Sequence, residues 1–74
     1  MDDFKISIAA ARVNAGKTQA EVASALHVGK QTVVSWEKGK TSPTIAKAQE
    51  FCDFCNIPID RVSFLRSSNQ IKSN

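Results

Sequence analysis

Apolar residues recur along the chain at the three- and four-residue spacing of helices, in five groups. Residues that interrupt helices lie between the groups, at positions 16, 27–29, 39–43 and 56–58. No stretch alternates cleanly between apolar and polar residues, so the pattern predicts no strands. We therefore predict an all-α fold of five short helices, over about 4–15, 18–26, 30–38, 45–55 and 59–65.

Capping residues support these boundaries. Thr18 and Glu21 have the spacing of a capping box, in which each side chain bonds a backbone N–H of the other residue. Gly16 follows the first predicted helix, where the backbone needs a residue that tolerates positive φ, and Asn56 ends the fourth. The same helical pattern predicts a buried core of Ile8, Val22, Ala23, Leu26, Val33, Trp36, Ala48, Phe51, Cys52, Cys55, Ile59 and Val62.

Only three residues, 27–29, separate the second predicted helix from the third. A connection this short prevents two helices from packing antiparallel along their lengths, and it favours the steep crossing of a helix-turn-helix. The third helix would then present an outward face with amide, hydroxyl, methyl and ammonium groups but no acid. That face consists of Lys30, Gln31, Val34, Ser35 and Lys38.

Length and composition fit one small soluble domain. The chain has 74 residues, 42% of them hydrophobic, and a net charge of +3 that permits an anionic partner. No apolar run approaches the roughly 18 residues of a membrane span. Because the acidic start is followed by no apolar segment, we expect no secretory signal and a cytoplasmic protein. We expect the domain to cover 1–66 and a polar, flexible tail to cover 67–74.

The sequence offers little for catalysis or metal binding. His27 is the single histidine, and no acidic residue lies within five positions of it. Cys52 and Cys55 have the C-x-x-C spacing of zinc and redox motifs, but a structural zinc needs four ligands. Their position within a helical pattern favours two small buried side chains instead. We therefore expect that the protein is not an enzyme and has no catalytic residue. We also expect it to bind no metal, cofactor or small-molecule ligand.

One pattern of residues runs from the first predicted helix to the residue before the fourth capping position: Arg12, Gly16, Gln19, Val22, Ala23, Val28, Val33, Ser35, Trp36, Glu37, Gly39, Lys40 and Pro43. With this pattern, the chain resembles the Cro/cI-type helix-turn-helix domain of phage repressors over about 8–65. The resemblance implies a compact five-helix, lambda-repressor-like DNA-binding domain whose second and third helices form the helix-turn-helix. It also implies a homodimer, formed mainly on DNA, that reads the major groove with the third helix.

The resemblance and the chemistry of the side chains together predict the roles of individual residues. The amide of Gln31 can pair with adenine N6 and N7, and Lys30 can reach guanine O6 and N7. The residues expected to read bases are Lys30, Gln31, Val34 and Ser35. Those expected to bind phosphates are Thr18, Gln19, Lys38, Lys40 and Thr41. In relatives, the positions of Arg12 and Glu37 hold a pair of residues that links the first helix to the third.

Two positions depart from the family pattern. His27 occupies a position in the turn that is usually Gly, and Lys17 replaces a Leu or Met. His tolerates positive φ better than most residues but at some strain. The stem of Lys17 can cover the same apolar surface while its ammonium stays in water.

The leading interpretation is a sequence-specific transcriptional regulator of the phage-repressor or Cro type that binds a two-fold symmetric operator in double-stranded DNA. The dimer contact would use Ile57, Pro58, Phe64 and Leu65, although the last two residues could simply close the core. One alternative is the antitoxin of a toxin–antitoxin pair. Another is a protein-interaction module that has lost DNA binding, which would favour acids or a broad apolar patch on the third helix.

Overall fold

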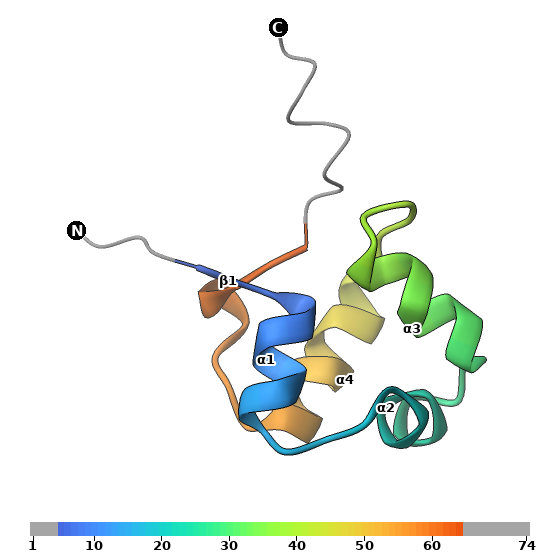
Figure 1. Ribbon diagram of the computed structural model, residues 1–74. Helices are drawn as coiled ribbons and strands as arrows, with labels where there is room; N and C mark the ends of the chain where they lie inside the picture. The colour runs from blue at the N-terminus through green and yellow to red at the C-terminus, as the bar shows by residue number, and fades with distance from the viewer. Residues whose placement is uncertain (1–4, 65–74) are drawn as a thin grey trace, which may run out of the picture.

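Four α-helices make up most of residues 5–64, the part of the chain that the computed structural model describes (Figure 1). They are α1 (Ile8–Asn14), α2 (Gln19–Leu26), α3 (Lys30–Glu37) and α4 (Ile45–Cys55). The last three agree closely with the predicted segments. The N-terminal part of the first predicted helix and the whole of the fifth form other structures, described below.

Each helix begins at a residue suited to capping. The Ser7 hydroxyl accepts a hydrogen bond from the Ala10 amide, 3.0 Å away, and the Thr44 hydroxyl caps α4 in the same way. The predicted capping box is present at α2, where Thr18 and Glu21 each accept a bond from the backbone of the other. Gly29 begins α3 without a side-chain cap. These local bonds define the starts of the helices because they satisfy amides that the helices leave unpaired.

Each of the four helices is followed, within two residues, by a residue with positive φ: 74° at Gly16, 58° at His27, 78° at Gly39 and 57° at Asn56. The residue after each of these donates its amide to a carbonyl five positions back; one example is the 3.0 Å bond from Val28 to the Ala23 oxygen. This left-handed ending reverses the chain within a few residues. His27 and Asn56 adopt it although they carry a Cβ.

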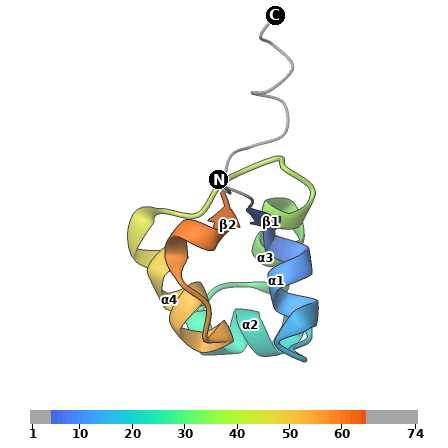
Figure 2. The same ribbon diagram turned by 90° about the vertical axis from the view of Figure 1, so that its left-hand side faces the viewer.

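Two short strands correct the prediction that the fold has no sheet. β1 (Ile6–Ser7) pairs in parallel with β2 (Val62–Ser63), and Figure 2 shows them side by side. The first helix therefore starts at Ile8, not near residue 4. The fifth predicted helix is a single 3₁₀ turn, η1 (Ile59–Arg61), followed by β2. Pairing between the two ends of the domain satisfies backbone groups that a longer helix would have satisfied internally.

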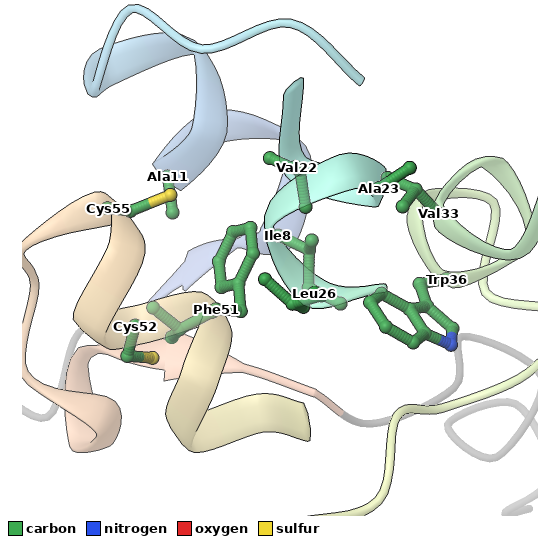
Figure 3. Packing of buried hydrophobic residues seen from close by; sticks show 11 residues of the cluster. Ile8, Ala11, Val22, Ala23, Leu26, Val33, Trp36, Phe51, Cys52 and Cys55 are labelled. Atoms are coloured by element: carbon green, nitrogen blue, oxygen red, sulfur yellow. The ribbon is translucent and has the colours of Figure 1, made fainter. Parts of the chain in front are cut away.

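The core lies where the four helices meet, around the fully buried Phe51 (Figure 3). The Phe64 ring packs edge-on against the Phe51 ring, with centroids 6.2 Å apart. Every residue of the predicted core is buried except Ile59, which is 37% exposed because a single 3₁₀ turn holds it at the surface. Ile45, at the start of α4, is 85% exposed although it belongs to an apolar stripe in the sequence. Leu65 and the expected tail lie outside the described residues.

Candidate nucleic-acid interface

The helix-turn-helix is formed by α2, the turn 27–29 and α3. In Figure 1, α2 is seen nearly end-on while α3 runs across the view, so the two helices cross steeply. The small side chain of Ala23 lies next to Val33 where the helices meet (Figure 3). Trp36 is 7% exposed and belongs to the core, as predicted, so α3 buries one side and leaves the other for a partner.

The four residues expected to read bases lie on the side of α3 that faces away from the core. Lys30 and Gln31 are exposed, and Val34 and Ser35 are half-buried. The acid at the end of the helix, Glu37, is held within the protein and does not belong to this surface. The outer face therefore offers a cation, an amide, a hydroxyl and a methyl-bearing side chain, which are the groups that contact base edges.

The residues expected to bind phosphates lie at the two ends of the motif. Thr18 is exposed at the start of α2, and Lys38, Lys40 and Thr41 are exposed beyond the end of α3. At the first of these ends the capping box uses the Thr18 backbone N–H. The Glu21 N–H donates to the Thr18 hydroxyl, so within this turn the amides of Gln19 and Ala20 remain available to an anion. At the second, Gly39 turns the chain away from the axis of α3.

Gln19 has a role within the protein that the sequence did not predict. Its amide nitrogen donates a hydrogen bond of 3.0 Å to Glu37 Oε1, so it links the first residue of α2 to the last residue of α3. The side chain is half-buried. One of its two N–H groups is thus committed to the protein, and the other remains for a ligand.

The structure brings Arg12 and Glu37 together, as the resemblance implied. Arg12 Nε lies 2.6 Å from Glu37 Oε2, and the two side chains are only 16% and 9% exposed. The same guanidinium donates to the Lys17 carbonyl through Nη1, at 2.9 Å. The hydrogen bond to Glu37 raises the pKa of Arg12, whose guanidinium is always charged in proteins. This pair joins α1 to the end of α3.

Lys47 is a second contact to the motif that sequence reasoning missed. Its ammonium donates a 2.6 Å hydrogen bond to the carbonyl of Leu26, the last residue of α2. The only signal in the sequence is Glu50 three positions later, which Lys47 also contacts at 3.3 Å. That spacing predicts a pair on the surface of α4 and says nothing of α2.

Lys17, Cys52 and Cys55, which the sequence singled out, all pack within the fold. The Lys17 ammonium lies 4.7 Å from the centre of the Phe54 ring, so its side chain covers apolar surface as expected. Cys52 and Cys55 are buried free thiols, and burial raises the pKa of both. Residues 5–64 contain no cluster of three or more potential metal ligands. No helix in this part of the chain is long and apolar enough to span a membrane.

Two comparisons with known proteins agree with this geometry. A family model for a helix-turn-helix, HTH_3, matches residues 8–62. The chain is also 36% identical over 56 residues to the cryptic phage CTXphi transcriptional repressor RstR of Vibrio cholerae. That match covers 76% of the chain and 50% of the relative, so the chain spans half of the relative's length. The match over 8–62 includes all four α-helices, and the chain belongs to the HTH_3 helix-turn-helix family.

Proposed function

We propose that the protein is a sequence-specific transcriptional repressor that binds double-stranded DNA and reads the major groove with α3. One observation carries the proposal: α3 packs its apolar side on α2 and turns Lys30, Gln31, Val34 and Ser35 outward. An α-helix with its side chains is about 10–12 Å wide, which matches a major groove about 12 Å wide. The similarity to a transcriptional repressor supports this function over the antitoxin and the interaction module.

Phosphate contacts at both ends of the motif would orient α3. Thr18 and Gln19 would bind DNA phosphates on one side of the groove. Lys38, Lys40 and Thr41 would bind those on the other side. Contacts of this kind bind DNA of any sequence and fix the register of the protein. The net charge of +3 favours the same partner. A role on chromosomal or phage DNA implies the cytoplasm as the location.

The same proposal includes a homodimer on a two-fold symmetric operator. Phe64 packs against Phe51 and therefore helps to close the core, and Ile57 is half-buried against the same core, while Pro58 is exposed. Beside Ile57 and Pro58 lies a hollow of about 340 Å³, which a second copy could fill. It is lined by Cys52, Asp53, Asn56, Ile57 and Pro58. In a dimer of this kind, two half-sites about 34 Å apart would each receive one α3.

Selection of bound duplexes from a random pool tests this function, and sedimentation on the selected duplex tests the dimer. We expect an enriched motif with two-fold symmetry and a complex that contains two chains per duplex. Recovery of duplexes with no shared sequence would reject the sequence-specific regulator. An asymmetric motif bound by one chain would reject the dimer while leaving the reading helix in place.

A further inference from the structure

We infer that Gln19 is a positioning residue, which couples the phosphate-binding end of α2 to the orientation of α3 through Glu37. The inference rests on the proposed function and goes beyond the simple phosphate contact expected of Gln19. Its starting point is the 3.0 Å bond from Gln19 Nε2 to Glu37 Oε1, which joins residues at opposite ends of the helix-turn-helix.

Glu37 is the place where three helices are joined. Its carboxylate accepts bonds from Arg12 Nε at 2.6 Å and from Arg12 Nη2 at 3.3 Å, in addition to the bond from Gln19. The bond from Gln19 is the shorter of the two that reach Oε1. Loss of Gln19 would therefore leave that oxygen with a single long contact, and the end of α3 would be held mainly through Oε2.

The other contacts between α2 and α3 do not fix their relative rotation as closely. Ala23 and Val33 are buried apolar residues at the crossing, and apolar packing has little directional preference. A hydrogen bond to a carboxylate depends strongly on distance and angle. The bond from Gln19 to Glu37 therefore adds a directional restraint between α2 and the end of α3, which supports the orientation of Gln31 and Ser35.

The chemistry of the amide allows Gln19 to make both contacts from one nitrogen. An amide nitrogen carries two N–H groups, and Glu37 takes one of them. The second can donate to a phosphate oxygen near the start of α2. A phosphate in the correct register would then be linked through a single nitrogen to the end of α3, and DNA contact would reinforce the orientation of the reading helix.

The test compares binding to a selected duplex with binding to a random duplex, and the ratio of the two dissociation constants is the readout. Gln19→Met keeps the length of the side chain and removes the donors. Gln19→Lys restores a donor that can reach Glu37. Lys40→Met is the matched control, since Lys40 is exposed beyond α3 and has only a phosphate to contact in the proposed complex. A thermal melt confirms that each variant is folded at the assay temperature.

We expect Gln19→Met to lower the ratio about tenfold, Gln19→Lys to restore most of it, and Lys40→Met to weaken both duplexes while leaving the ratio unchanged. A folded Gln19→Met variant with the wild-type ratio would overturn the inference and leave the proposed function intact. A low ratio that Gln19→Lys does not restore would also overturn it, because Glu37 would then not be the link. A wild-type protein with no preference for any duplex would overturn the inference together with the proposed function.

Discussion

The ammonium of Lys47, on α4, donates a 2.6 Å hydrogen bond to the carbonyl oxygen of Leu26, the last residue of α2. The C-terminal end of a helix carries unpaired carbonyls and a partial negative charge, so a cation is favourable there. The next residue is His27, whose left-handed backbone starts the turn. Lys47 therefore holds the helix-turn-helix at its turn, while Arg12 and Gln19 hold it at the opposite end.

Lys47→Met should lower the free energy of unfolding by about 1 kcal/mol, because it removes a charge-assisted bond and keeps the aliphatic stem. Urea denaturation measures this loss. Lys5→Met is the matched control, since Lys5 is exposed and its loss should change little. Equal effects of the two substitutions would show that the contact with Leu26 adds nothing to stability.

Arg12→Met should cost about 3 kcal/mol of unfolding free energy, because Glu37 would be left as an unpaired and largely buried carboxylate. The double variant Arg12→Met/Glu37→Leu removes both charges and should recover part of that loss. Denaturation of the two single variants and the double variant gives the coupling energy of the pair. Additive losses would mean that the two side chains act independently.

His27→Gly should raise the free energy of unfolding by about 0.5 kcal/mol. Glycine removes the strain of a left-handed backbone, and the exposed His27 side chain has little packing to lose. Asn56→Gly provides the comparison at nearly the same φ, and it should gain less because Asn tolerates this conformation. A loss of stability in His27→Gly would show that the imidazole makes a favourable contact in the turn.

Stability should fall as the pH rises above about 8.5. Burial raises the pKa of Cys52 and Cys55, so the folded chain keeps both thiols protonated while the unfolded chain releases its protons near pH 8.5. The unfolded state then binds fewer protons, and the free energy of unfolding decreases by up to about 1.4 kcal/mol per pH unit for each thiol. Denaturation under reducing conditions measures the slope, which should flatten in Cys52→Ala/Cys55→Ala. If the unfolding free energy of that variant fell with pH as steeply as in the wild type, titratable groups other than the two thiols would cause the loss of stability.

Local signals in the sequence predicted most of the fold. The capping box at Thr18, the positive φ at Gly16 and the bounds of α4 all depend on residues within one or two helical turns. The pairing of Ile6 with Val62 depends on two segments at opposite ends of the domain, each too short to show an alternating pattern. The same contact explains why the last predicted helix ends after a single 3₁₀ turn.

Local spacing in the sequence predicted only part of the candidate site. Lys30 and Gln31 were identified because their spacing places them opposite the apolar face of their own helix. The bond from Gln19 to Glu37 and the bond from Lys47 to Leu26 join different helices, and their geometry depends on how those helices cross. Sequence spacing contains no information on such distances unless a related protein supplies it, as the resemblance did for Arg12 and Glu37.

The central claim is that α3 reads bases while the residues beyond it hold phosphates, and titration of two substitutions on two duplexes tests it most directly. Gln31→Ala should cost about 1–3 kcal/mol on the selected duplex, relax the preference at one base pair and leave random DNA nearly unaffected. Lys40→Ala should weaken both duplexes alike and lower the slope of log K against log salt by about one unit. If Gln31→Ala stayed folded and kept the wild-type preference at every base pair, α3 would not be the reading helix.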